Sequence, residues 1–315
     1  MGIESSKIML VSVIIPAYNS EKTIVRTLDS VFSQNYASLE VIVVNDGSTD
    51  NTEQVVKSYS DKIIYIAQKN AGVSVARNKG FEVSSGEFIQ YLDADDLLAE
   101  DKISQQVKAI LDSRADVAYG DWKKFNELNG YQEFETVKKE MKGRPEIELI
   151  TDFWIPLAAL LYTRSIANKI GGWNLDLPII QDARYALDAA IQGAKFVYTP
   201  GIMGLYRVND SGSLSTLSRM SFMSDCYLNA KQIDAIWRKD YDTDREKKNA
   251  VIGVLRFCIS EFSKLDKVKF NQAIDLILSI DKNYKPEGSI GMKVMSSLLG
   301  YRTAEKIAQF KRKLG

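Results

Sequence analysis

The chain has 315 residues, 45% hydrophobic and 26% charged, which is typical of a soluble globular protein with one large or two modest domains. Its 41 basic and 41 acidic residues balance, so no overall basic field for nucleic acid exists and no nucleic-acid partner is expected. Histidine is absent, which excludes Ser-His-Asp and Cys-His catalysis and histidine metal ligands.

Cysteine and hydropathy patterns bear on the compartment. Cys226 and Cys258 form no Cys-x-x-Cys pair, which indicates a reducing compartment and argues against a disulfide framework or a zinc site. No run approaches the ~20 apolar residues of a membrane span, and the N-terminus has no long apolar signal segment. We therefore expect a cytoplasmic protein that touches a membrane, if at all, peripherally at the cytoplasmic face of the inner membrane.

The first hundred residues alternate strands with helices. Short apolar runs predict strands at residues 10–15, 40–45, 63–67 and 88–92. Helical spacing predicts a helix opened by Ser20 or Glu21 that reaches Phe32, and helices at 52–60 and 72–84. This order predicts an α/β fold, a Rossmann-like, mostly parallel sheet with helices on both faces. Neither G-x-G-x-x-G nor G-x-x-x-x-G-K-[ST] is present, so a dinucleotide enzyme and a P-loop NTPase are not supported.

Polar residues follow these strands, at the edge where open α/β sheets bind ligands. Asp46 can accept hydrogen bonds from ribose hydroxyls or a base N–H, and Arg77 can supply positive charge or stack on a base. Simpler alternatives remain at this stage. Asp46 can belong to a turn that caps a helix, and Arg77 can be a solvated or carboxylate-paired surface residue.

Three carboxylates follow the strand at 88–92: Asp93, Asp95 and Asp96. Such a cluster is costly, because like charges repel and burial disfavours ionised acids. Mg²⁺ or Mn²⁺ prefers oxygen ligands and removes both costs. Residues two apart point the same way, so Asp93 and Asp95 can face one ligand. The alternative is a solvated acidic turn that caps the next helix at Asp96 or Asp101.

Four segments in this order resemble the N-terminal half of the family-2 glycosyltransferases, inverting enzymes of the GT-A fold that use nucleotide sugars: VSVIIPAYN, VVNDGSTD, NAGVSVARNKG and YLDADD. The resemblance implies a nucleoside pocket lined by Pro16, Ala17, Tyr18 and Asn19. It implies that Asp46 and Arg77 contact the uracil or ribose side. It also implies a sugar-diphosphate and metal site at Asp93, Ala94 and Asp95, with Asp95 the more direct metal ligand beside Asp93.

The second half contains the proposed acceptor side. We expect a strand at 117–119, a polar surface excursion at 123–144, an apolar strand-like run at 155–163, and a helix from about 180 to 192. The turn Gly171-Gly172-Trp173-Asn174 resembles the block that precedes the family's catalytic helix. The resemblance implies that Asp182 is the general base, whereas the alternative is a carboxylate that stabilises the N-terminus of its helix.

Two positions depart from the family pattern. Gln181 replaces the usual glutamate beside the base, and Asn209, after Tyr206-Arg207-Val208, stands where a histidine is common. An amide can donate to a phosphate oxygen but carries no charge. We expect diphosphate or acceptor contacts from Trp173, Gln181, Arg207 and Asn209.

The last hundred residues read as helices, at 220–237, 248–265, 270–280 and 292–314. The final basic amphipathic stretch suits an anionic bilayer surface, or else packs on its own domain. We predict a GT-A domain at 1–217, with a nucleotide-sugar half at about 1–121 and an acceptor half at about 122–217. A C-terminal helical region would follow at 218–315.

The resemblance implies an inverting hexosyltransferase that needs Mn²⁺ or Mg²⁺ and uses a UDP-sugar, for which we expect UDP-glucose or UDP-galactose. Together with the basic C-terminal stretch, the resemblance implies a sugar acceptor, best a GlcNAc- or GalNAc-diphosphate-polyprenol in the synthesis of O-antigen (lipopolysaccharide) or capsule, and a β-linked product. Alternatives are a non-catalytic nucleotide-sugar-binding or scaffold protein and a sugar nucleotidyltransferase. The latter needs a Gly-rich N-terminal loop that is missing here. A further alternative is a polyprenyl-phosphate glycosyl synthase, but such enzymes commonly carry membrane spans, and this sequence has no run long and apolar enough to form one.

Overall fold

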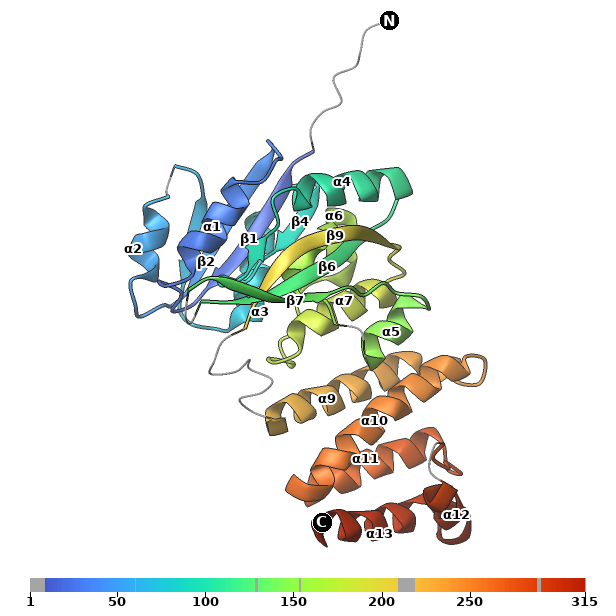
Figure 1. Cartoon of the computed structure of the whole chain (residues 1–315). Coiled ribbons are helices and arrows are strands. Elements are labelled where there is room, and N and C mark those ends of the chain that lie inside the picture. The colour runs from blue at the N-terminus through green and yellow to red at the C-terminus, as the bar shows by residue number, and fades with distance from the viewer. Residues whose placement is uncertain are drawn as a thin grey trace, which may run out of the picture. The chain divides into compact units, whose positions relative to one another are not determined.

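The computed structural model describes residues 9–59, 61–127, 130–152, 154–208, 219–287 and 290–314, without the side chains of 311–314. The chain forms two compact units, one of residues 1–149 and 153–213, the other of residues 150–152 and 214–315. The first unit is built on a sheet and the second on helices (Figure 1). The domain boundary predicted between residues 217 and 218 lies outside the described residues.

The first half of the sheet is parallel. Its strands are β1 (Val11–Ala17), β2 (Leu39–Asp46), β3 (Ile64–Gln68) and β4 (Phe88–Tyr91), in the order β3-β2-β1-β4. β1 is buried along its whole length because it pairs with β2 on one side and β4 on the other. The four predicted strands and their parallel pairing are confirmed, and their carboxyl ends share one edge.

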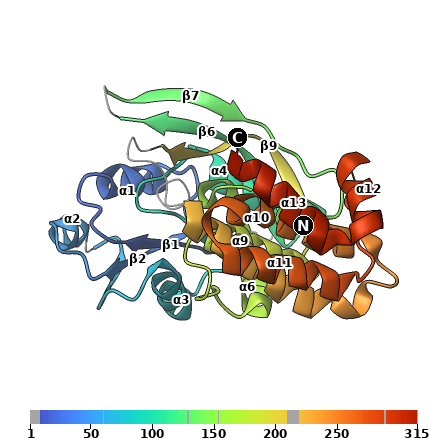
Figure 2. The same cartoon turned by 90° about the horizontal axis from the view of Figure 1, so that it is seen from below.

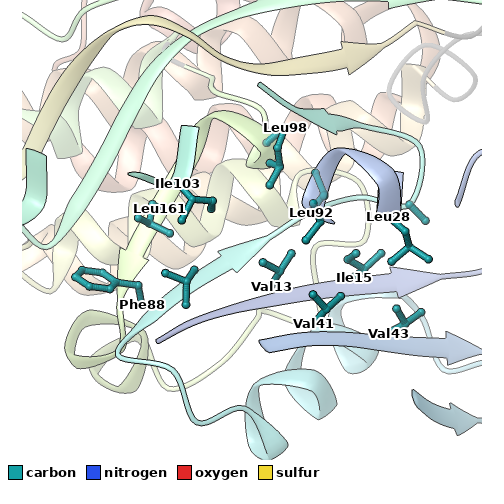
Figure 3. Packing of buried hydrophobic residues seen from close by; sticks show 14 of the residues in the cluster. Val13, Ile15, Leu28, Val41, Val43, Phe88, Leu92, Leu98, Ile103 and Leu161 are labelled. Carbon is teal, nitrogen blue, oxygen red and sulfur yellow. The ribbon is translucent and has the colours of Figure 1, made fainter. Parts of the chain in front are cut away.

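Helices cover both faces of this half, namely α1 (Ile24–Phe32), α2 (Thr52–Lys57), α3 (Val73–Val83) and α4 (Lys102–Ser113). Val13, Ile15 and Leu28 belong to one buried cluster (Figure 3), in which each side chain contributes roughly 1.5–3 kcal/mol by burial. Alternate β1 residues face the opposite side. There α3 packs so closely that a Cβ at Gly80 would lie 2.4 Å from Ile14 Cγ2.

The second half of the sheet is mixed. It holds β5 (Leu97–Leu98), β6 (Val117–Asn126), β7 (Gln132–Val137), β8 (Leu160–Thr163) and β9 (Phe196–Arg207). β8 runs antiparallel to both β4 and β6, and β9 runs parallel to β6. Of the eight strand pairings among the described residues, four are parallel and four antiparallel, so the sheet is mixed overall.

The polar stretch 123–144 differs from the prediction of a surface excursion. The strand expected at 117–119 continues to Asn126, and β7 pairs with it in antiparallel register. Lys123 bonds Glu133 and Lys124 bonds Glu135, both at 2.7 Å. Opposite charges across neighbouring strands stabilise the pairing, so charged residues here mark a strand pair rather than a loop.

Four further helical segments complete the part of the chain before residue 208: α5 (Pro145–Thr151), η1 (Leu157–Ala159), α6 (Arg164–Ile170) and α7 (Gln181–Ile191). The apolar run at 155–163 is therefore a short 3-10 turn followed by a four-residue strand, β8. The helix predicted at about 180–192 is confirmed as α7.

The second unit contains α9 (Arg219–Trp237), η2 (Arg238–Asp240), α10 (Arg245–Leu265), α11 (Lys267–Ile280), α12 (Ile290–Leu299) and α13 (Tyr301–Leu314). α10 packs against both α9 and α11 (Figure 2). The single helix predicted at 292–314 is broken, because Gly300 has a φ of 78°, a left-handed conformation that ends α12. Among the described residues, no helix has the length and apolarity that a membrane crossing requires.

Candidate active site

The four residues predicted to line a nucleoside pocket lie at the end of β1 and in the loop that follows it. Pro16 and Ala17 are buried in the end of β1, whereas the Tyr18 side chain is 51% exposed. Asn19 has a φ of 49°, which asparagine tolerates better than most residues, and its Oδ1 accepts a 2.8 Å bond from the Thr49 backbone N–H. The loops after β1 and β2 are therefore held together at the carboxyl edge of the sheet.

Asp46 ends β2 and organises the neighbouring loop. Its Oδ1 accepts from Gln68 Nε2 at 2.7 Å and from the Ala71 N–H at 2.8 Å, and its Oδ2 accepts from the Gly72 N–H at 2.9 Å. Gly72 directly precedes α3. Three of the roughly four lone-pair directions of this carboxylate are thus used by the chain itself, and Asp46 fixes the start of the helix that carries Arg77.

Arg77 is buried, with 1% of its side chain exposed, rather than solvated. Its guanidinium donates to Asp93 Oδ1 at 2.5 Å and lies 4.2 Å from the centre of the Trp173 ring. Its Nε and Nη1 are buried without a hydrogen-bond partner among the described residues. Buried N–H donors without acceptors are costly, and cationic ones match carboxylate or phosphate oxygens best. Arg77 is therefore fixed in place with donors that a ligand can satisfy.

Residues 93–96, here called the acidic turn, follow β4. The Asp93 side chain is 37% exposed, Ala94 is buried, and Asp96 is buried with its Oδ1 accepting from the Arg207 N–H at 2.8 Å. Burial, and then repulsion by Asp95 and Asp93, raise the pKa of Asp96 well above its usual range. The Arg207 side chain donates to the Asp95 carbonyl at 2.9 Å. Asp96 thus ties the turn to β9, whereas Asp93 and Asp95 are less buried than Asp96.

The carboxylates of the acidic turn suit a divalent cation whose remaining coordination positions are filled by the substrate. The mutual repulsion that raises the pKa of Asp96 shows excess negative charge at the acidic turn. Among the described residues, no group of three or more acidic or cysteine side chains is arranged as a complete ion cage. Mg²⁺ in phosphate-transferring sites is commonly bound by one or two carboxylates together with phosphate oxygens and waters. Asp93 and Asp95 fit that pattern.

Asp182 is the second residue of α7. Its Oδ2 accepts from Trp154 Nε1 at 2.7 Å and its Oδ1 accepts from the Ala183 N–H at 2.8 Å. Burial raises the pKa of Asp182, the two hydrogen bonds and Arg77 oppose the rise, and Asp93 adds to it. The ring of Tyr185, on the same helix, stacks on Trp173, and Trp173 lies against the Arg77 guanidinium, so α7 and Arg77 belong to one neighbourhood.

Tyr206, near the end of β9, lies within electrostatic range of both the acidic turn and Asp182. Burial raises the pKa of Tyr206, and four carboxylates raise it further: Asp96, Asp182, Asp95 and Asp93. Its ring packs edge-on against Trp154, with ring centres 5.2 Å apart. Trp154 and Tyr206 were not among the site residues predicted from the sequence. The only sequence signal was their position, beside the apolar run at 155–163 and directly before Arg207.

The remaining predicted contacts lie around this centre. Trp173 is buried, its ring is stacked 4.2 Å from the Tyr185 ring centre, and its backbone N–H donates to Asn78 Oδ1 at 2.8 Å. Gln181 Oε1 accepts from the Asp182 N–H at 2.9 Å, so that oxygen caps the helix. The Arg207 guanidinium pairs with Glu127, which also pairs with Arg26, and Glu127 was not predicted as a site residue. Asn209 lies outside the described residues.

The fold and the site first define a class of protein. A β3-β2-β1-β4 parallel half, joined by an antiparallel β8 to a second half and followed at β4 by an acidic turn, is the GT-A glycosyltransferase architecture. The structure of S. aureus TarS 1–349 in complex with UDP-GlcNAc superimposes with a TM-score of 0.67 at 22% identity, over 96% of this chain and 90% of that chain. The mannosyltransferase PcManGT from Pyrobaculum calidifontis, in complex with GDP-Man and Mn²⁺, gives 0.58 at 19% identity over 98% and 88%. At these identities the likeness concerns the fold.

The sequence then defines the family. Residues 12–166 match "Glycosyl transferase family 2", and the chain carries a domain of that family. Glycosyltransferase GlyA of Streptococcus pneumoniae is 41% identical over 123 residues, 38% of this chain and 18% of GlyA. The uncharacterized glycosyltransferase YibD of Escherichia coli is 38% identical over 116 residues, 35% of this chain and 34% of YibD. The similarity therefore spans about a third or less of these relatives.

Proposed function

We propose that this protein is an inverting glycosyltransferase that moves a hexose from a UDP-sugar, with UDP-glucose or UDP-galactose the preferred candidates, to a hydroxyl of a sugar acceptor. The observation that supports this best is electrostatic. Asp182 interacts with Asp93 and Arg77, and carboxylates from both α7 and the acidic turn act on Tyr206. A base and a diphosphate site in one neighbourhood are what a single displacement requires.

The donor binds, in this proposal, along the carboxyl edge of β1, β2 and β4. The nucleoside pocket consists of Pro16, Ala17, Tyr18, Asn19 and Asp46. Arg77 offers two nitrogens, Nε and Nη1, which have no partner among the described residues, to oxygens of the nucleotide sugar. Arg207 supports the acidic turn from β9. TarS is similar in fold and has been solved with UDP and with UDP-GlcNAc, which supports a UDP-sugar here.

A divalent cation, Mn²⁺ or Mg²⁺, would be held by Asp95 and Asp93 and, when bound, would stabilise the negative charge of the leaving diphosphate. Arg77 supplies positive charge to the same region through its pair with Asp93. Asp96 is occupied by its bond to the Arg207 N–H and keeps the turn in place.

The chemical step uses Asp182 as general base. Its carboxylate takes the proton of the acceptor hydroxyl as the oxygen bonds to the anomeric carbon. The bond from that carbon to the diphosphate breaks on the opposite face, and UDP leaves with the electron pair. One displacement inverts the centre, so an α-linked donor gives a β-linked product, in contrast to two-step retaining hydrolases. Because burial raises the pKa of Asp182, the carboxylate is a stronger base than a solvated aspartate.

The acceptor is, in this proposal, a GlcNAc- or GalNAc-diphosphate-polyprenol used in O-antigen or capsule synthesis at the cytoplasmic face of the inner membrane. α12 supports contact with a lipid surface. Ile290, Val294 and Leu298 lie at helical spacing and are 85%, 50% and 77% exposed. The exposed amines of Lys293 and Lys306 lie on α12 and α13. Exposed apolar residues next to basic ones suit an anionic membrane.

A donor screen tests the proposal. The chain is incubated with a panel of UDP- and GDP-sugars, with Mn²⁺, Mg²⁺ or EDTA, and with sugar or lipid-diphosphate-sugar acceptors. The expected result is UDP release that requires both acceptor and cation, with a β-linked product by NMR. Cation-dependent UDP binding without transfer to any acceptor would instead identify a non-catalytic binding protein. Pyrophosphate release from UTP and a sugar phosphate would identify a nucleotidyltransferase.

A further inference from the structure

Within the part of the chain that the structure describes, one side chain, the indole of Trp154, hydrogen-bonds the carboxylate of Asp182. Trp154 Nε1 donates to Oδ2 at 2.7 Å, while Oδ1 accepts, among the described residues, from the neighbouring backbone N–H of Ala183 at 2.8 Å. The second bond is formed within the first turn of α7 and exists for any carboxylate that folds back on its helix. The first bond comes from a distant segment, so it determines which way the carboxylate faces.

The indole itself is fixed by two other rings. Trp122, on β6, meets Trp154 edge-on with ring centres 6.0 Å apart at 89°. Tyr206, on β9, meets it at 5.2 Å and 77°. Edge-to-face contacts of this kind hold rings in defined orientations. The N–H of Trp154 therefore points at Asp182 because strands β6 and β9 position the ring.

We propose that Trp154 is a positioning residue for the general base. Its indole N–H holds Oδ2 of Asp182 so that the remaining lone pairs of the carboxylate face the acceptor hydroxyl. The inference rests on the function proposed above. It adds a residue that neither the sequence motifs nor the family match over residues 12–166 assigns to the site. Holding the base in a fixed position increases the rate of transfer, because a small displacement of a reacting group lowers the rate by a large factor.

The charged and titratable groups around Asp182 define the pH behaviour. Asp93 opposes its ionisation and Arg77 favours it. The charge of Asp182 also acts on Tyr162 and Tyr206, and it raises the pKa of both. A hydrogen bond to the charged form favours that form, so loss of the Trp154 N–H raises the pKa of Asp182. Transfer requires the ionised base and is lost as pH falls through this pKa, so the acid limb moves to higher pH.

The test compares Trp154→Phe, which keeps the ring and removes the N–H, with Trp237→Phe. Trp237 is the matched control, because it is a buried tryptophan on α9, in the second unit, and the candidate site does not include it. Two measurements are made on each protein: the carboxyl titration of Asp182 by ¹³C NMR, assigned with Asp182→Asn, and the pH dependence of transfer. In Trp154→Phe we expect the pKa of Asp182 and the acid limb to rise together by about one unit. We also expect kcat on the pH plateau to fall about tenfold or more, with KM for the donor unchanged. Trp237→Phe leaves all three unchanged.

The two readouts separate this inference from the proposed function. An unchanged Asp182 titration in Trp154→Phe overturns the positioning role, whether or not the protein transfers sugar. A shifted titration together with an unshifted acid limb keeps the Trp154 contact but removes Asp182 as the base, which refutes the proposed mechanism. A tenfold loss of kcat that also appears in Trp237→Phe would mean that the loss does not depend on the bond between Trp154 and Asp182, and this too would overturn the inference.

Discussion

The two edges of the candidate site are held by different kinds of interaction. On the donor side, polar side chains at the ends of β1 and β2 are fixed by hydrogen bonds to backbone groups of neighbouring loops, as Asp46 is by Ala71 and Gly72. On the acceptor side, Asp182 is fixed by an indole that two further aromatic rings support.

The two sides of the site depend on different parts of the sheet. Hydrogen bonds on the donor side join loops that follow neighbouring parallel strands, so their geometry is complete once the first half of the sheet has formed. The aromatic residues on the acceptor side come from separate strands, β6 and β9, and from the segment between η1 and α5. Their arrangement exists only after the second half of the sheet has formed. A substitution such as Arg77→Met on the donor side should therefore affect mainly UDP affinity, whereas a substitution such as Asp182→Asn on the acceptor side should affect mainly kcat.

The largest effect is expected for Asp182→Asn, which keeps the size of the side chain and removes the base. General bases contribute about 10²–10⁴-fold, so kcat should fall by that factor while UDP affinity and melting temperature stay near those of the wild type. Steady-state transfer assays and UDP titration calorimetry measure both. Asp176→Asn, on the exposed loop before α7, is the control and should retain transfer. Full activity in Asp182→Asn would refute its role as base.

A somewhat smaller loss is expected for Asp95→Ala. Removing a metal-binding carboxylate weakens charge stabilisation on the leaving diphosphate, so transfer should fall by at least about 100-fold. The dependence of UDP binding on Mn²⁺ should weaken as well, which a calorimetric titration with and without EDTA detects. Asp101→Asn, just before α4, is the matched control. If cation dependence is unchanged in Asp95→Ala, the metal site lies elsewhere.

The smallest effect is expected for Arg77→Met, which sharpens the donor side of the comparison. The substitution removes the N–H donors that a ligand would satisfy, so UDP affinity should fall about tenfold with a lesser effect on kcat. Stability should change little, because an apolar side chain suits the buried position and Asp93, whose side chain is 37% exposed, can be solvated. Lys79→Met on the same helix, at an exposed position, should leave UDP binding unaltered. Equal affinity in both variants would exclude Arg77 from the donor site.

The parts of the fold that were predicted well have strong local signals. Four apolar runs ending in polar turns marked β1 to β4, and the structure places them as expected to within a residue or two. The parts predicted poorly have mixed local signals. The charged residues of β6 and β7 pair with one another across the strands, and Lys123 and Glu133 meet only when the hairpin has formed. Gly300 divides the last helix through its φ of 78°, which apolar periodicity does not reveal.

The candidate site shows the same division. Asp93, Asp95 and Asp182 stood in recognisable sequence patterns, whereas Trp154 and Tyr206 did not, because a ring in an apolar or mixed stretch looks like any core residue. Arg77 was visible as a cation after a strand, but its burial over Trp173 depends on a turn near residue 172 that reaches α3 through Asn78.

The sequence alone determined the alternating strands and helices of the first half, the family of the domain, and the chemical types at the sheet edge, since these follow from periodicity and short motifs. Tertiary structure alone decided that β8 enters antiparallel, that Asp96 faces β9 while Asp93 faces Arg77, and that an indole orients Asp182. Each of these depends on contacts between residues far apart in the chain, and such contacts leave no local pattern to read.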